Sequence, residues 1–145
     1  MTSSPIVVAG VTFHARPMTA QDRNAVFATW MRSARQSLEE TRHVAFDVFQ
    51  RSYPGFVERL LDGARTVVLF RQDSPAVVHA WACAGGPDVL HWAYVPFRLR
   101  GEGIGRAVIT AALGGYPDRI DLTTPRQRRD AGRWIFNPFV AGAWA

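Results

Sequence analysis

Residues 91–113 read HWAYVPFRLRGEGIGRAVITAAL, and this stretch decides the fold. It opens with the apolar and aromatic residues of a strand and closes with apolar residues at helical spacing. Between the two, Gly101, Gly103 and Gly105 occupy three of five positions. Because glycine costs backbone entropy, such a cluster indicates either a tight turn or a ligand that lies close to the backbone.

The turn leads into the first residues of a helix, where unpaired N–H groups and the positive end of the helix dipole suit a phosphate or diphosphate. The spacing from Arg100 to Gly105 is R-x-x-G-x-G. A P-loop would need a Gly-Lys-Ser/Thr sequence, which is absent, and a dinucleotide fingerprint would need G-x-G-x-x-G. A glycine turn that binds no ligand stays open as an alternative.

Length and composition describe one globular domain, expected over residues 1–145, with 48% hydrophobic and 20% charged residues. No apolar run is long enough to span a bilayer, and the first ten residues lack the positive region of a signal peptide. The single cysteine, Cys83, excludes an internal disulfide and suits a reducing compartment. We therefore expect a cytoplasmic protein that makes no contact with membranes.

The net charge is +5, and all 17 basic residues are arginine. A GC-rich coding genome explains the missing lysine, and so does a surface that meets phosphates, because guanidinium groups bind phosphate through two hydrogen bonds. Apart from residues 126–129 the arginines are scattered, so nucleic-acid binding is compatible with the sequence but not indicated. The four histidines and Cys83 show no metal-ligand spacing, and we expect no metal.

The rest of the chain predicts an α/β domain with a mostly antiparallel sheet flanked by helices. Thr19 is the expected N-cap of the first helix, and the second is expected to break near Tyr53-Pro54-Gly55. Thr124-Pro125 predicts the start of a last helix that runs to about Phe136, ahead of a closing strand in residues 137–145. The expected strands are 11–17, 64–70, 76–84, 89–95 and 119–124, and the expected helices are 19–37, 44–61, 104–113 and 126–136.

Residues 94–109, YVPFRLRGEGIGRAVI, resemble the acyl-coenzyme A binding motif of the GNAT N-acetyltransferase superfamily, whose pattern is Q/R-x-x-G-x-G/A. The order of the expected elements is also similar to that family. The resemblance implies a GNAT-like mixed sheet with a shortened C-terminus, because only nine residues follow Phe136. The chain further resembles short members of the family from phages and prophages.

The resemblance implies a role for each residue of the motif. Backbone N–H groups of the turn would bind the coenzyme A diphosphate, and Arg100 holds the Q/R position. Tyr94 and Val95 would lie where the strand parts from its neighbour, and their backbone would bind the pantetheine arm. The residues implied in diphosphate binding are Gly101, Gly103, Ile104, Gly105 and Arg106.

Catalytic residues are harder to assign. The position at which many family members carry a base falls on Val89, which has none. His91 lies two residues further, so it should point to the same face, and with an ordinary pKa near 6.5 it is a candidate base. A half-buried structural histidine is the alternative. Trp134-Ile135 occupies the region of the family's tyrosine acid, which leaves Tyr94 and Tyr116 as candidate acids.

The leading hypothesis is an acyl-coenzyme A dependent N-acyltransferase that uses acetyl-coenzyme A and an amine of a small molecule or a protein. Another subunit could complete the acceptor side, so a homodimer is compatible. A competing hypothesis is a GNAT-fold protein without transferase activity that serves as a binding or phage structural component. A third is an enzyme that modifies nucleic acid, which rests on the positive charge.

Overall fold

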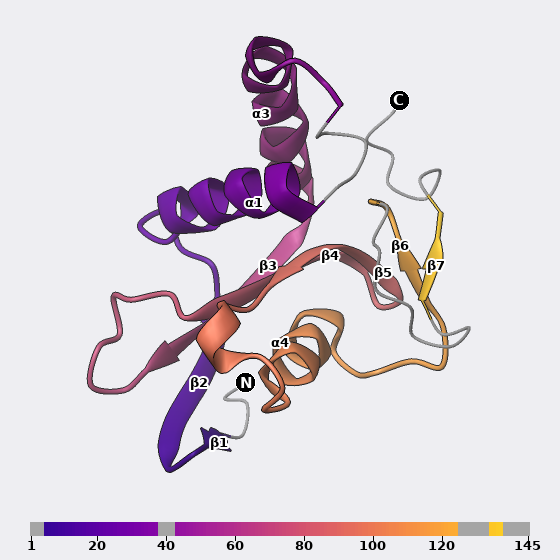
Figure 1. Ribbon diagram of the computed structural model, residues 1–145. Coiled ribbons are helices and arrows are strands. Elements are labelled where there is room, and N and C mark those ends of the chain that lie inside the picture. Colours follow the sequence, from indigo (N-terminus) through magenta and orange to yellow (C-terminus); the bar gives the residue numbers. More distant parts are fainter. Residues whose placement is uncertain (1–4, 38–42, 125–133, 138–145) are drawn as a thin grey trace.

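The fold is built on one seven-stranded sheet in which the strands lie in sequence order, β1 to β7 (Figure 1). The computed structural model describes residues 5–37, 43–124 and 134–137. The first five strands pair antiparallel, whereas the β5–β6 and β6–β7 pairs are parallel. The strands are β1 (Ile6–Val8), β2 (Val11–Pro17), β3 (Arg65–Arg71), β4 (Ala80–Gly86), β5 (Val89–Tyr94), β6 (Ile120–Leu122) and β7 (Trp134–Phe136). This is the mixed, mostly antiparallel sheet that the sequence predicted.

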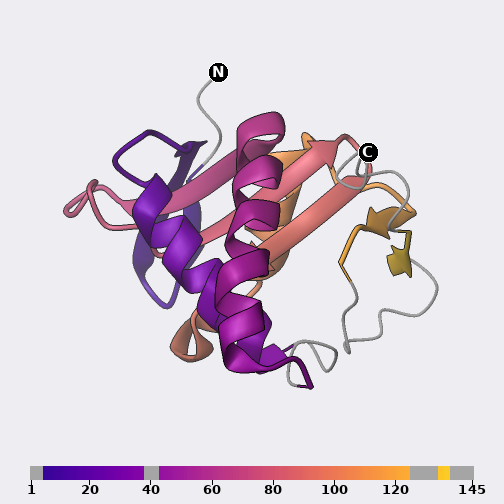
Figure 2. The same ribbon diagram turned by 90° about the horizontal axis from the view of Figure 1, so that it is seen from above.

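Helices cover both faces of the sheet. Helices α1 (Arg23–Ser37) and α3 (Phe46–Gly63) lie on one face, and α4 (Ile104–Leu113) lies on the other (Figures 1 and 2). A short 3-10 helix, η1 (Phe97–Leu99), joins β5 to the glycine turn ahead of α4. None of the described helices combines the length and apolar character that crossing a membrane requires.

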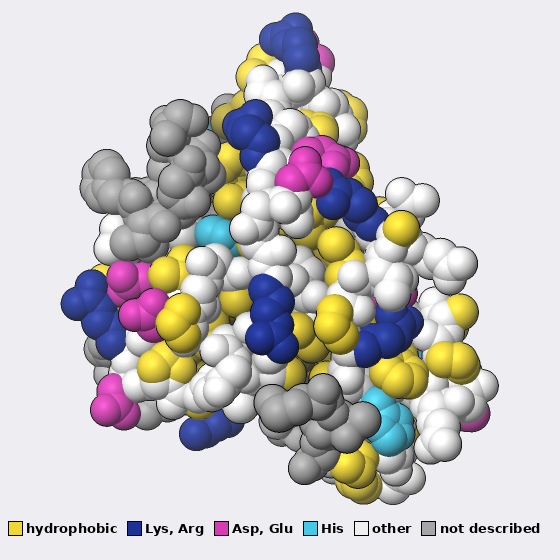
Figure 3. All heavy atoms as spheres, turned by 180° about the vertical axis from the view of Figure 1, so that it is seen from behind, with side chains coloured by type: hydrophobic (Ala, Val, Ile, Leu, Met, Phe, Trp, Pro, Cys, Tyr) yellow, Lys and Arg dark blue, Asp and Glu magenta, His cyan; other side chains and the backbone are white. Residues whose placement is uncertain are grey.

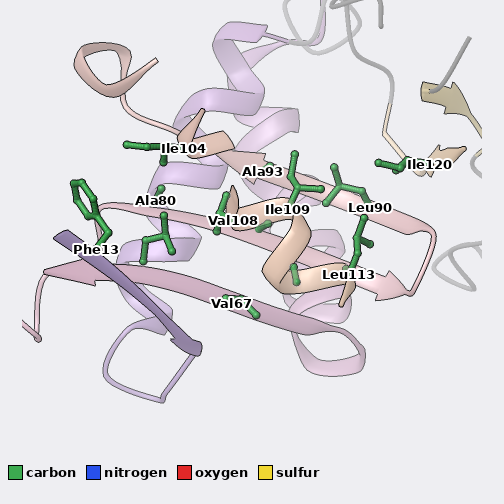
Figure 4. Close-up of a cluster of buried hydrophobic side chains, with 14 of the residues drawn as sticks. Phe13, Val67, Ala80, Leu90, Ala93, Ile104, Val108, Ile109, Leu113 and Ile120 are labelled. Atoms are coloured by element: carbon green, nitrogen blue, oxygen red, sulfur yellow. The ribbon is translucent and has the colours of Figure 1, made fainter. Parts of the chain in front are cut away.

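The core on the α4 face fixes that helix against the middle of the sheet. Its buried residues, Ile104, Val108, Ile109, Ala112 and Leu113, recur at helical spacing. Figure 4 shows Ile104, Val108, Ile109 and Leu113 in one cluster with side chains from β2, β3, β4, β5 and β6. The cluster therefore holds α4 against several strands of the sheet.

Tryptophans dominate the core on the opposite face. The rings of Trp81 and Trp92 have their centroids 5.3 and 6.2 Å from that of Trp30. The indole N–H of Trp81 donates to Thr29 Oγ1 at 2.8 Å, and that of Trp92 donates to Ser33 Oγ at 3.1 Å. Both partners lie on α1, so these bonds fix the helix against β4 and β5 while satisfying polar groups that packing would bury.

The expected N-cap at Thr19 is wrong, because α1 begins four residues later, at Arg23. Residues 20–22 form a turn, and the Thr19 N–H donates to the carboxylate of Asp22 at 2.8 Å. The same carboxylate accepts bonds from the Thr19 hydroxyl and from Arg16 on β2. Asp22 therefore organises the connection from β2 to α1, a role that the short-range pattern of the sequence did not reveal.

The expected break at Tyr53-Pro54-Gly55 is also wrong, because α3 runs without interruption through Pro54. Its buried residues Phe49, Val57 and Leu60 keep the helical period on both sides of the proline. The ring of Tyr53 stacks on that of Phe49 at 4.8 Å. Tertiary packing of this face outweighs the hydrogen bond that proline removes.

Two further boundaries differ from the expected ones. Strand β4 begins at Ala80, because residues 77–79 have the backbone of a loop. Residues 134–136 form β7, parallel to β6, where a helix end was expected. The rest of that expected helix and the closing strand lie outside the described residues. The edge strand β1 was not predicted, since three residues are too few to show alternation.

We expect Asp22→Asn to lower the free energy of unfolding by about 2 kcal/mol, because the bonds that it weakens involve charged groups. Asp22 is 3% exposed. Burial works against its charge, but the Arg16 and Thr19 hydrogen bonds outweigh that effect and lower the pKa. Urea unfolding followed by tryptophan fluorescence measures the change. The control is Asp62→Asn, whose ion pair with Arg23 is exposed and should contribute less than about 1 kcal/mol. Equal losses for both variants would contradict the role given to Asp22.

Candidate functional site

Strands β5 and β6 are joined by a short parallel ladder. Their pairing consists of Val89 with Asp121 and Leu90 with Leu122. The N–H of Asp121 donates to the carbonyl of Asp88 at 2.8 Å, and that of Thr123 donates to the carbonyl of Leu90 at 3.2 Å. In the described part of the chain, no further residue pair joins the two strands. Tyr94 and Val95 therefore lie beyond the last described residue pair of β5 with β6.

The glycine turn connects β5 to α4 with a backbone that ordinary residues resist. Gly101 has φ +85° and Gly103 has φ +81°, both in the left-handed region. Gly103 is the N-cap of α4, and no side chain caps this end of the helix. The first intrahelical bond runs from the N–H of Ala107 to the carbonyl of Gly103 at 3.1 Å. The N–H groups of Ile104, Gly105 and Arg106 precede it and have no acceptor within the helix.

The remaining residues of the motif support this turn in different ways. The side chain of Ile104 is 1% exposed and belongs to the core, so only its backbone can meet a ligand. A β-carbon on Gly105 would lie 3.6 Å from Cγ2 of Val95, an ordinary contact distance. The Nε of Arg100 donates to the carbonyl of Val95 at 2.9 Å. That carbonyl, which the resemblance implies would bind a pantetheine arm, accepts this one bond and keeps a second lone pair.

Arginines surround the turn. Arg98, Arg100 and Arg106 are exposed, and no ion pair joins them to a carboxylate within the described ranges. The guanidinium of Arg106 lies 4.4 Å from the centroid of the Tyr116 ring. Arg106 also lines a groove of about 410 Å³ between α4 and the β1–β2 hairpin, and this groove reaches Gly103. Elsewhere basic side chains are dispersed, as Figure 3 shows for one face. Nucleic-acid binding stays a prediction.

The side chains of His91 and Val89 lie on the same side of β5, as expected, because a β-carbon on Gly85 would meet both, at 2.7 Å from Nε2 of His91 and 3.1 Å from Cγ1 of Val89. Two bulges nevertheless interrupt the pairing of β4 with β5. Cys83 pairs with Trp92 and Ala84 with Leu90, so His91 is an extra residue in β5. Ala84 pairs with Leu90 and Gly86 with Val89, so Gly85 is an extra residue in β4. The imidazole therefore lies over the extra residue of β4.

The surroundings of His91 differ from those expected of a free base. The residue is 4% exposed, and its Nδ1 lies 2.7 Å from the hydroxyl of Thr123. Burial lowers the pKa of His91 to about 4. The ordinary pKa assumed from the sequence is therefore wrong, and the imidazole is neutral at pH 7. The burial and the bond to Thr123 are those of a structural histidine, the alternative given above. A role for His91 as a base stays a prediction.

The candidate acids do not converge on His91. Tyr94 is the last residue of β5, and its ring stacks with that of Trp81 at 6.3 Å between centroids. Tyr116 follows α4 and lies under Arg106. Trp134 and Ile135 belong to β7. Among the described residues, no three His, Cys, Asp or Glu side chains gather in a way that could hold a metal ion.

Three residues at the end of the described β5–β6 ladder were not predicted to contact His91: Gly85, Thr123 and Thr124. The hydroxyl of Thr124 donates to the carbonyl of His91 at 2.8 Å. Thr123 and Thr124 are 1% and 4% exposed. The Thr-Thr pair at the end of a strand was visible in the sequence, but the partner of each hydroxyl depends on strand register. A register between distant strands cannot be read from one sequence.

A mixed, mostly antiparallel sheet with a glycine-led helix between β5 and β6 is the GNAT-like fold that the sequence predicted. A solved structure, that of apo-form YjaB from Escherichia coli, shares the fold at a TM-score of 0.52 and 17% identity. The match covers 70% of this chain and 65% of that one, so the chain corresponds to about two thirds of YjaB. No protein-family model and no curated protein sequence matches the chain.

Two further structures are similar at lower scores. The GCN5-related N-acetyltransferase from Rhodopseudomonas palustris has a TM-score of 0.47 and 21% identity, over 77% of this chain and 64% of that one. The putative acetyltransferase yncA from Salmonella typhimurium, solved with acetyl-CoA, has a TM-score of 0.45 and 17% identity, over 72% of this chain and 66% of that one. The resemblance to phage-type members stays a prediction.

We expect acid to destabilise the protein through His91. Because burial favours the neutral imidazole, the unfolded chain binds a proton between pH 6.5 and about 4 that the folded chain does not. The free energy of unfolding should therefore fall by up to about 3 kcal/mol as the pH is lowered through that window. Urea unfolding at several pH values measures this slope.

The variant His91→Asn should flatten the slope, since asparagine does not titrate there. His79, whose pKa burial and the nearby Arg71 and Arg98 also lower, contributes its own slope to both proteins. The control is His43→Asn, at an exposed position. An unchanged slope in His91→Asn would contradict the burial of a neutral imidazole.

Proposed function

We propose that the protein is an acyl-coenzyme A dependent N-acyltransferase that takes acetyl-coenzyme A as donor and an amine of a small molecule or a protein as acceptor. One observation carries this proposal: the glycine turn after β5 leads into a helix N-terminus that no side chain caps. The donor has a matching shape, a thin amide-containing arm that ends in a diphosphate. A strand edge suits the arm, and free N–H groups suit the diphosphate.

The binding step follows from these residues. The N–H groups of Ile104, Gly105 and Arg106 hold the diphosphate, and Gly103 allows the backbone to approach it without a side chain in between. The guanidinium groups of Arg98 and Arg106 add positive charge around it. The pantetheine arm runs along β5 beyond the Leu90–Leu122 pair, where the backbone of Tyr94 is available to its amides. Its thioester then lies near the end of the described β5–β6 ladder.

The transfer step forms one bond and breaks another. The nitrogen of a neutral amine attacks the thioester carbonyl, and the tetrahedral intermediate expels the coenzyme A thiolate, which takes up a proton released by the amine. Holding the amine and the thioester in contact supplies much of the rate in such a reaction. A dedicated base is therefore not required by this proposal. The fold contributes orientation and an anion-binding helix end.

Calorimetry with acetyl-coenzyme A tests the proposal first, and we expect a dissociation constant of about micromolar size. An absence of heat at millimolar ligand would overturn the proposal. Release of free thiol in the presence of a panel of polyamines, amino acids and peptides tests transfer. Tight binding without thiol release from any amine would favour the competing hypothesis of a binding protein with this fold.

We expect Gly105→Ala to weaken acetyl-coenzyme A binding at least tenfold without harming the fold. The new methyl group would point toward Val95, with 3.6 Å to its Cγ2, so the protein itself can accommodate it. It would stand between the first turn of α4 and the end of β5, where the donor has to pass. The free energy of unfolding should stay level or rise by less than about 1 kcal/mol, because alanine favours helix.

The matched control is Gly55→Ala, a glycine within α3 whose β-carbon would meet only the end of the Arg59 side chain, at 3.6 Å. It should give a similar change in unfolding free energy and leave the affinity for acetyl-coenzyme A unaltered. Calorimetry and thermal melts on the same preparations separate the two effects. Equal affinities for Gly105→Ala and the natural protein would place the donor elsewhere.

We expect Arg106→Gln to weaken binding about fivefold at low salt, and by less at 1 M salt, where charges more than about 3 Å apart are screened. A positive side chain in the first turn opposes the helix dipole, so its removal should not destabilise α4. The control is Arg51→Gln on the exposed surface of α3. A loss of affinity that does not depend on salt would contradict an electrostatic role for Arg106.

A further inference from the structure

His91 connects β4, β5 and the end of β6 where the described β5–β6 ladder ends. Its ring lies over Gly85, the extra residue of β4, and its Nδ1 lies 2.7 Å from the hydroxyl of Thr123, which follows β6. Its carbonyl accepts a hydrogen bond from the hydroxyl of Thr124 at 2.8 Å. Two successive threonines therefore hold the side chain and the backbone of one bulged residue.

The hydrogen bond between His91 and Thr123 has a direction that can be deduced. The Thr123 hydroxyl is buried, with the residue 1% exposed, so its proton needs an acceptor. Within the described residues the structure gives this hydroxyl one partner, Nδ1 of His91. If Nδ1 carried the proton, the hydroxyl proton would be left buried without an acceptor. The Thr123 hydroxyl therefore donates, Nδ1 accepts, and a neutral imidazole carries its proton on Nε2.

The two threonines also mark the end of the β5–β6 contact. The ladder ends at the Leu90–Leu122 pair, and the N–H of Thr123 still donates to the carbonyl of Leu90 at 3.2 Å. The Thr124 hydroxyl then reaches the carbonyl of His91, one residue further along β5. These contacts bind the strands up to His91. Beyond it, β5 continues through Tyr94 without a residue pair to described β6 residues.

We propose that Thr123 and Thr124 are positioning residues: they hold His91 as its Nε2–H tautomer across the paired bulges and fix the end of β6 to β5 at this residue. The effect on the donor rests on the proposed function, because the pantetheine arm would run along β5 directly beyond His91. The same geometry gives His91 a supporting role. Its Nδ1 lone pair is used by Thr123, so the imidazole has no free lone pair with which to act as a base.

Nitrogen NMR of the protein labelled with ¹⁵N-histidine tests the tautomer at neutral pH without any coenzyme. We expect long-range proton–nitrogen couplings that identify Nε2 as the protonated nitrogen of His91. Assignment comes from the signal that His91→Asn removes. A proton on Nδ1 would overturn the proposal, and so would two tautomers in comparable amounts, because the Thr123 hydroxyl would then not be fixing the ring.

The variant Thr123→Val removes the hydroxyl and keeps the shape of the side chain. We expect it to mix the His91 tautomers and to weaken acetyl-coenzyme A binding roughly fivefold, as expected for the loss of one hydrogen bond. Thr123→Ser should restore both the tautomer and the affinity. Thr124→Val should weaken binding by a similar factor but leave the tautomer unchanged, since Thr124 bonds the carbonyl of His91.

The matched control is Thr66→Val, another buried strand threonine, 5% exposed, which lies on β3 opposite Cys83 of β4. It should change neither the His91 signals nor the affinity. If Thr123→Val does not fold, the proposal is tested by the His91 tautomer of the natural protein and of the Thr123→Ser variant. A wild-type protein that shows the Nε2–H tautomer but binds no acetyl-coenzyme A would refute the proposed function and leave the tautomer assignment standing. Tautomers unaffected by Thr123→Val would overturn the positioning role.

Discussion

The hydrogen bond from the Thr123 N–H to the Leu90 carbonyl ends the backbone pairing between β5 and β6 in the described chain. Up to this bond the described sheet is continuous. The core fixes this end of the ladder against the glycine-led helix, because Ile104 and Val108 of α4 belong to one cluster with Leu90 of β5 and Ile120 of β6.

The end of the described β5–β6 ladder leaves backbone acceptors on β5 that strand pairing does not satisfy, and buried backbone groups rarely stay without a partner. Side chains supply the donors: the Thr124 hydroxyl donates to the His91 carbonyl, and Arg100 donates to the Val95 carbonyl. The bulges at Gly85 and His91 lie in the same part of the sheet and add local twist, as bulges generally do. Specific contacts thus hold the end of the ladder in place.

Local patterns were sufficient to predict what depends on near neighbours. The spacing of Val108, Ile109, Ala112 and Leu113 predicted α4, and the glycine spacing predicted a tight turn ahead of it. The same patterns failed where distant contacts decide. Pro54 stays inside α3 because the buried face of the helix continues, and Asp22 organises its turn because Arg16 lies across from it on β2. The bulge at His91 was not predicted, because the register between strands is not visible in one sequence.

Three departures from ordinary local preference meet at the start of α4. Gly101 and Gly103 hold a left-handed backbone, the helix begins without a side-chain cap, and Arg106 places positive charge at the positive end of the dipole. Each of these lowers the stability of an isolated helix start. Natural chains tend to keep such combinations where function requires them, because the rest of the fold then has to compensate. An anion bound at this turn would reverse the sign of two of the three, by accepting the free N–H groups and by neutralising Arg106. The same residues that weaken the empty helix end would therefore strengthen the occupied one.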